Sequence, residues 1–99
     1  MWTQKEIDEV LGQHSKIFSF FYGVQEKGNV PRASDIQGEL INQNVLIETH
    51  TIKETSEKFS ISEKDAHEIL QQCRDLVLIF ALFFNNFFIK ELKLKLNLF

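Results

Sequence analysis

The stretch Ile52–Leu70, IKETSEKFSISEKDAHEIL, constrains the fold of this chain more than any other. Apolar and small residues follow helical spacing on both sides of a short break at Ser60, which predicts two helices joined by a tight turn. Ser62 can N-cap the second helix, with Asp65 three residues on in the manner of a capping box. Helices joined so closely cross at a steep angle, and Ser56 supplies a small side chain at the expected crossing.

The residues after the turn place one apolar face on the second helix, made of Ala66, Ile69, Leu70 and Cys73. Over residues 52–70 the pattern resembles the helix-turn-helix of transcription regulators. It departs at Ser60, where glycine is usual, and at Ala66, where a larger aliphatic residue is common. The resemblance implies a small, mostly α-helical domain of helix-turn-helix type, with the motif over residues 52–73. Such a domain is winged if a β-hairpin follows the motif.

A chain of 99 residues is one domain at most, and burying roughly 60–65% of its unfolded surface provides one modest core. Its single cysteine excludes an internal disulfide, and Cys73 on an apolar helix face is typical of a buried small hydrophobic residue. The sequence has neither a cysteine framework nor an N-terminal apolar stretch, the two features that would indicate secretion. We therefore expect an intracellular protein, in the nucleus or the cytoplasm.

A first helix is predicted over residues 3–22. Thr3 and Glu6 form a capping box, and Trp2 and Ile7 occupy the two positions of a hydrophobic staple. Gly12 lies inside this helix, where glycine is unfavourable by about 1 kcal/mol relative to alanine. The apolar stripe that should face the core is Ile7, Val10, Leu11, Phe18 and Phe21, with His14 and Ile17 at its margin.

The segment between this helix and the motif is less regular. Residues 28–31 read as a loop, and a shorter helix is predicted to start at Ser34. The β-branched residues of Val45–Thr49 can form a short strand or simply lead into the motif.

Residues 76–99 differ from the helical body, residues 1–75, in being strongly apolar. The run LVLIFALFF starts at Leu76, and the Asn85-Asn86 dipeptide after it can form a two-residue turn. From Glu91 onward leucines alternate with polar residues, which is the period of a half-buried strand. These features predict a C-terminal β-hairpin in the position of a wing.

Two other interpretations of this apolar tail stay open. As a helix, residues 76–89 would span about 21 Å, short of the roughly 30 Å hydrocarbon core of a bilayer, so a membrane is the less favoured partner. Of the 24 residues 76–99, 21 are Phe, Ile, Leu, Lys or Asn, which are encoded by AT-rich codons. The tail can therefore also be a divergent C-terminus appended to a truncated domain.

No group of residues predicts catalysis. The glycines are scattered, so no phosphate-binding loop is expected, and acidic pairs such as Asp35 and Glu39 are typical of solvated helix faces. No zinc-ligand spacing occurs among the four candidate metal ligands His14, His50, His67 and Cys73. We expect a protein that is not an enzyme and that uses no cofactor and no metal.

Charge is unevenly distributed along the chain. Residues 1–75 carry 13 acidic and 8 basic groups, a net charge of −5, whereas residues 76–99 carry Lys90, Lys93 and Lys95 against Glu91. An acidic body disfavours general affinity for phosphate backbones. In a DNA-binding motif the second helix would enter the major groove, where Gln71 can read adenine and Lys64 can meet guanine or phosphate. The candidate partner-binding residues on this helix are Glu63, Lys64, His67, Glu68, Gln71, Gln72 and Arg74.

These charges favour a non-catalytic interaction module that binds another protein. Ten phenylalanines are many for a small core, and aromatic residues are enriched in interfaces. The helix-turn-helix resemblance implies assembly in transcription-related machinery. The alternatives are a sequence-specific DNA-binding regulator and a small membrane-associated protein that uses its tail, and a homo-oligomer is compatible with each.

Overall fold

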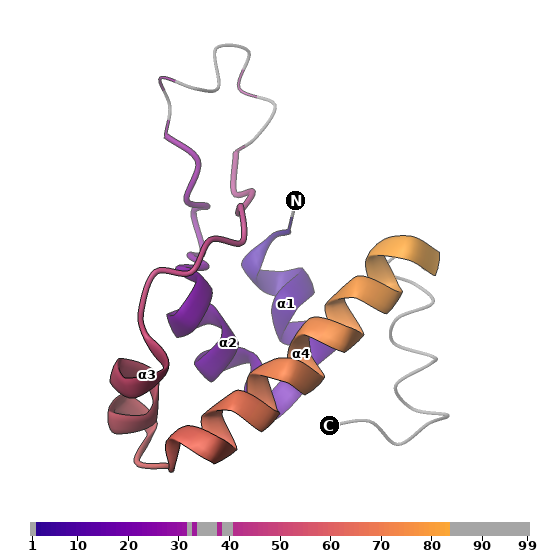
Figure 1. Cartoon of the computed structure of the whole chain (residues 1–99). Coiled ribbons are helices and arrows are strands. Elements are labelled where there is room, and N and C mark those ends of the chain that lie inside the picture. Colours follow the sequence, from indigo (N-terminus) through magenta and orange to yellow (C-terminus); the bar gives the residue numbers. More distant parts are fainter. Residues whose placement is uncertain (1, 32, 34–37, 39–40, 84–99) are drawn as a thin grey trace.

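The chain is mostly α-helical over the residues that the computed structural model describes, which are 2–31, 33, 38 and 41–83 (Figure 1). Helix α4 lies across α1 and α2, and α3 packs at its N-terminal end, where it contacts both α2 and α4. The elements in order are α1 (Gln4–Leu11), a 3-10 helix η1 (Gly12–His14), α2 (Ser15–Tyr22), α3 (Ile52–Phe59) and α4 (Glu63–Phe83).

The first predicted helix is broken into two. Its N-terminal capping box is confirmed: the Glu6 N–H donates to Thr3 Oγ1 at 3.1 Å, and the Thr3 N–H donates to Glu6 Oε1 at 3.0 Å. The prediction of one continuous helix over residues 3–22 is wrong, because Gly12 adopts φ +54° and ψ −121°. Glycine tolerates this conformation without a Cβ clash, so the chain changes direction and α2 packs against α1.

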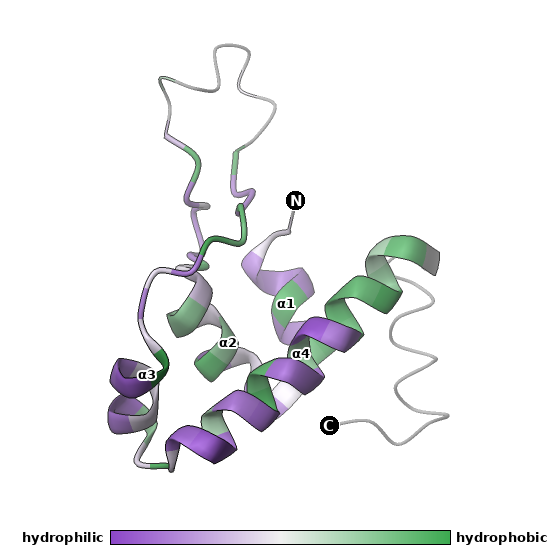
Figure 2. Ribbon diagram, viewed as in Figure 1, coloured by the Kyte–Doolittle hydropathy of each residue, from purple (hydrophilic) through white to green (hydrophobic). Residues whose placement is uncertain are grey.

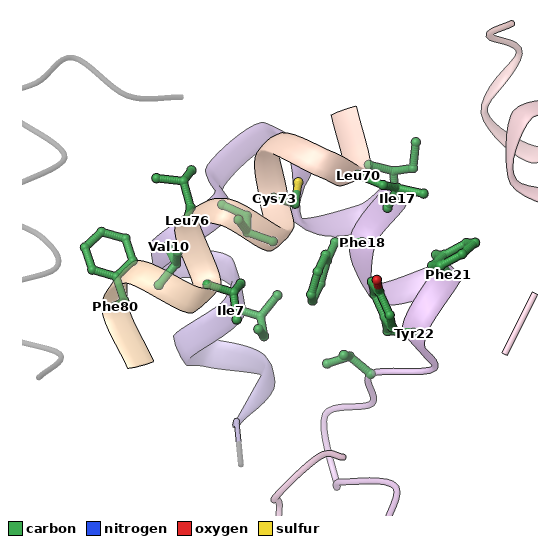
Figure 3. Close-up of a cluster of buried hydrophobic side chains, with 13 residues drawn as sticks. Ile7, Val10, Ile17, Phe18, Phe21, Tyr22, Leu70, Cys73, Leu76 and Phe80 are labelled. Atoms are coloured by element: carbon green, nitrogen blue, oxygen red, sulfur yellow. The ribbon is translucent and has the colours of Figure 1, made fainter. Parts of the chain in front are cut away.

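The predicted apolar stripe is buried between α1, α2 and α4 (Figure 3). Ile17, expected at its margin, belongs to the same core. Burial of a side chain such as Phe18, which is 1% exposed, contributes roughly 1.5–3 kcal/mol. The buried apolar side chains on the two N-terminal helices are Ile7, Val10, Leu11, Ile17, Phe18, Phe21 and Tyr22, and those on α4 are Ala66, Leu70, Cys73, Leu76, Val77 and Phe80.

Residues 23–51 connect α2 to α3 with no α-helix among the residues described there, and Asn44 holds this connection to the N-terminus. Its side chain is fully buried, donates to Trp2 O and Gln25 O at 3.0 Å each, and accepts from the Gln25 N–H at 2.9 Å. The Asn44 N–H also donates to Trp2 O at 2.7 Å. One asparagine side chain therefore pairs both backbone groups of Gln25 and gives the Trp2 carbonyl a second hydrogen bond.

The predicted strand over Val45–Thr49 does not form. The main chain of Val45 bonds instead to the Asn29 amide, whose Nδ2 donates to Val45 O and whose Oδ1 accepts from Val45 N–H. At the other end the Thr49 N–H donates to Phe21 O at 2.8 Å. The predicted loop at residues 28–31 is confirmed, and the helix predicted from Ser34 lies largely outside the described residues.

Helix α4 continues to Phe83, well past the boundary expected at Leu76. The prediction of a first hairpin strand is therefore wrong over residues 76–83, and the rest of the predicted hairpin lies outside the described residues. The helix continues because its period places Leu76, Val77 and Phe80 on the face that already buries Ala66. The two-residue period of a strand would put these three side chains on two opposite sides. In the described part of the chain no helix is both long and apolar enough to cross a membrane.

We predict that Asn44→Ala lowers the free energy of unfolding by about 1–3 kcal/mol, because the backbone N–H and C=O of Gln25 lose their partner and the Trp2 carbonyl keeps only its bond to the backbone N–H of residue 44. Urea denaturation followed by circular dichroism measures the change. Glu26→Ala, at an exposed neighbouring position, is the control and should shift stability by less than about 0.5 kcal/mol. Equal stability of the two variants would contradict the role given to Asn44.

Candidate functional site

The start of α3 is held by a second capping box. The Glu54 N–H donates to Thr51 Oγ1 at 3.0 Å, and the Thr51 N–H donates to Glu54 Oε1 at 2.9 Å. Hydrogen bonds from the Thr51 backbone N–H and from the Thr51 side chain to the Glu54 carboxylate lower the pKa of Glu54 below its ordinary value, because they stabilise the charged form, and nearby His50 lowers it further. Glu54 is thus an anion at neutral pH on the outer surface of α3.

The turn between α3 and α4 depends on serine residues. Ser60 adopts the left-handed conformation, φ +56° and ψ +44°, and Ile61 N–H returns to Ser56 O at 3.0 Å. Ser56 is 6% exposed, which agrees with its expected place near the crossing of the helices. The predicted N-cap of α4 is confirmed, since the Asp65 N–H donates to Ser62 Oγ at 3.0 Å.

Phe20 of α2 fixes α3 and the segment before it against the body. Its ring stacks on His50 with centroids 3.8 Å apart and planes 10° apart, and it meets Phe59 edge-on at 5.8 Å. The His50 ring also bonds through Nδ1 to the carbonyl oxygen of Phe20 at 2.8 Å. Because a carbonyl oxygen can only accept, Nδ1 carries the proton in this bond and Nε2 remains for another partner.

The candidate residues on α4 lie on its outer surface, with one exception. Arg74 is half-buried, and its Nη1 donates to Tyr22 Oη at 3.1 Å while its Nη2 donates to Gln71 Oε1 at 2.9 Å. Arg74 therefore joins α4 to α2 as well as facing outward. The exposed members of the set are Glu63, Lys64, His67, Glu68, Gln71 and Gln72.

The structure brings two of these residues, His67 and Arg74, to an open cleft of about 540 Å³. The opposite side of this cleft is the segment that leads into α3. Sequence reasoning did not select this segment, because its residues follow no helical or strand period and reach α4 only through the fold. The lining residues are Phe21, Tyr22, Glu48, Thr49, His50, Thr51, Ile52, Glu54, His67 and Arg74.

The cleft contains groups of both charges on a partly apolar floor. Its lining includes Glu48, Glu54 and Arg74 together with the apolar side chains of Phe21 and Ile52. Such a mixture suits a polar peptide segment, which presents hydrogen-bond donors and acceptors together with some apolar surface. Among the described residues, no three His, Cys, Asp or Glu side chains are arranged to hold a metal ion.

Cys73 lies on the inner face of α4, pointing into the core (Figure 3). Burial raises the pKa of its thiol from 9.0 to about 12, because the thiolate loses its hydration, and Arg74 offsets this in part. A thiol that stays protonated at neutral pH is a poor nucleophile, so Cys73 acts as a core residue.

No family model and no solved structure matches the chain. It is similar to the uncharacterized protein B0495.5 of Caenorhabditis elegans, with 28% identity over 83 residues. The aligned region is 77% of this chain and 11% of that protein, so the chain spans about a ninth of the length of the relative it matches.

We predict that Thr51→Ala destabilises the protein by about 1 kcal/mol at pH 7, since it removes one half of the capping box of α3. It should also raise the pKa of Glu54 towards its ordinary value. Because the folded-state pKa of Glu54 is lowered, the cap stabilises the fold above about pH 4.5 and loses this contribution as the pH falls through the folded pKa.

Urea titrations at pH 7 and pH 3 test this prediction, with Thr51→Ser as the control that keeps the hydroxyl. The difference between wild type and Thr51→Ala should shrink at pH 3. If the stability difference between wild type and Thr51→Ala is the same at both pH values, the charge of Glu54 does not contribute to the cap.

We predict that Cys73 of the native protein resists thiol reagents at pH 8. A pKa of about 12 in place of 9.0 leaves about 1,000-fold less thiolate, and burial blocks access as well. The rate of reaction with a chromogenic disulfide should therefore rise steeply in denaturant. The double variant Gln72→Cys with Cys73→Ala moves the thiol by one residue to an exposed position, where it should react at the rate of a free thiol. Equal reaction rates for the folded wild type and the folded double variant would refute the prediction.

Proposed function

We propose that this chain is a non-catalytic interaction module of helix-turn-helix type that binds another protein through the outer face of α4. The observation that carries the proposal is the exposure of six candidate side chains on one helix whose opposite face is buried in the core. A helix held rigidly along one side presents the other side with little loss of conformational entropy on binding, which favours affinity.

Charge indicates the kind of partner. Residues 63–75 of α4 carry Glu63, Asp65, Glu68 and Asp75, all exposed, and Lys64 is the one exposed cation among them. The remaining cation there, Arg74, bonds to Tyr22 and Gln71. An acidic surface attracts a basic one, which raises the rate of encounter and disfavours partners of the same charge.

The helix-turn-helix part of the proposal rests on the geometry between α3 and α4. The left-handed Ser60, the buried Ser56 and the capping by Ser62 are what a tight turn between two crossing helices requires. We extend the role to transcription-related assembly by analogy of fold.

A second candidate is a DNA-binding regulator. It is favoured by the exposure of Lys64 and Gln71 on α4, the helix that would enter the major groove. The carboxylates around them would repel phosphate groups, and the guanidinium of Arg74 is shared with Tyr22. The exposed carboxylates of α4 and the bond from Arg74 to Tyr22 therefore favour protein binding over DNA binding.

The variant Glu68→Lys separates the two candidates, because they predict opposite effects. Anisotropy of a labelled lysine-rich helical peptide and of a labelled DNA duplex, each titrated with the full chain, provides the measurement. We expect the peptide to bind and to lose about five-fold in affinity on Glu68→Lys, the range of one exposed charge pair. The peptide affinity should also fall as salt screens the charges.

The matched control is Glu26→Lys, which makes the same change in net charge at an exposed site away from α4. It should leave peptide affinity nearly unchanged. Duplex binding that strengthens on Glu68→Lys and is lost on Lys64→Glu would establish the DNA-binding candidate instead. Equal effects of the two lysine substitutions on peptide binding would remove α4 as the binding face.

A further inference from the structure

The outer face of α4 changes character along the helix (Figure 2). It is polar up to Asp75, and the turns from Leu76 onward are apolar. Three large side chains there remain in solvent: Leu78 is 58% exposed, Ile79 is 41% exposed and Leu82 is 65% exposed. Together they form an apolar patch, residues 78, 79 and 82, next to the acidic surface described above.

This apolar patch lies on the side of α4 that faces away from the core. The helical period places Leu78 and Leu82 one turn apart with Ile79 beside them, whereas Leu76, Val77 and Phe80 point into the core. A helix that is apolar on all sides is typical of a buried position. The last two turns of α4 are thus built to be covered on both sides.

We propose that residues 91–99 of the same chain cover the apolar patch. This segment lies outside the described residues, and it alternates Leu92, Leu94, Leu96 and Leu98 with Lys93, Lys95 and Asn97. In an extended conformation its leucines share one side, with successive leucines about 6.6 Å apart. That spacing matches the rise of about 6 Å between Leu78 and Leu82 on the helix.

The covalent connection permits this docking. Residues 84–90 join Phe83 to Glu91 and can span up to about 25 Å, whereas the patch extends back only about 7.5 Å along the helix from Phe83. A segment on so short a tether has an effective concentration in the millimolar range, so a small contact area is sufficient.

A second copy of the chain suits the patch less well. A stable dimer interface buries about 800 Å² on each partner through roughly 20–30 residues, far more than three side chains offer. Association between separate molecules also costs translational and rotational freedom that a tethered segment has already lost.

Nuclear Overhauser contacts between methyl groups test the proposal in the unmodified full-length chain. We expect contacts from Leu78 and Leu82 to the leucines of residues 92–98. These contacts should be absent from a spectrum that selects contacts between differently labelled molecules in a mixed sample, because they form within one chain. Contacts that appear between molecules would assign the patch to a second copy and overturn the proposal. Absence of any contact from Leu78 and Leu82 to the tail would overturn it as well.

A pair of double variants provides an independent test. Leu94→Ser with Leu96→Ser removes apolar side chains from the docking side, and Lys93→Ser with Lys95→Ser makes a matched change on the other side. The first should raise the fluorescence of an apolar-surface dye severalfold, and the second should leave it within two-fold of wild type. Equal dye binding by the two variants would refute the proposal, and if either variant loses helical circular dichroism, the contacts in the unmodified chain decide.

Discussion

Burial of one face of α4 is the interaction on which the rest of this structure depends. The helix lies across α1 and α2, and its inner side chains from Ala66 to Phe80 complete a core that those two short helices cannot enclose alone (Figure 3). Helices of eight residues are marginal in water by themselves, so most of their stability must come from this packing. The outer face of α4 is consequently held in a defined orientation, which makes it a surface that a partner can recognise.

The long connection before α3 has a different physical basis. Val24 and Leu46 pack against the core, and amide side chains take the place of a sheet in the rest of it. Asn44 and Asn29 bond to the main chain of segments on either side of them, so that this irregular backbone satisfies its polar groups. The Phe20 and His50 rings then fix the end of the connection, which brings Glu48 and Thr51 to the cleft beside α4.

Acidic, mixed-charge and apolar surfaces meet along α4. The acidic surface and the cleft share His67, and the apolar patch begins one turn beyond Arg74. A partner for such a surface would be basic with some apolar side chains, a composition that differs from the uniform negative charge of nucleic acid. The thiol of Cys73 lies beneath it in the core, where burial raises its pKa and disfavours the reactive thiolate.

The sequence by itself determined the features that depend on neighbours in the chain. The sequence predicted the capping box of Thr3 and Glu6, the cap at Ser62, the turn at Ser60 and the apolar stripe of α1 and α2, because helix ends and amphipathic faces follow from residues three or four positions apart. Tertiary structure alone decided the break at Gly12, the role of Asn44 and the helical state of residues 76–83. Each of these depends on contacts between residues far apart in sequence, and the run from Leu76 is apolar enough for strand or helix until the core formed by α1 and α2 selects the helix.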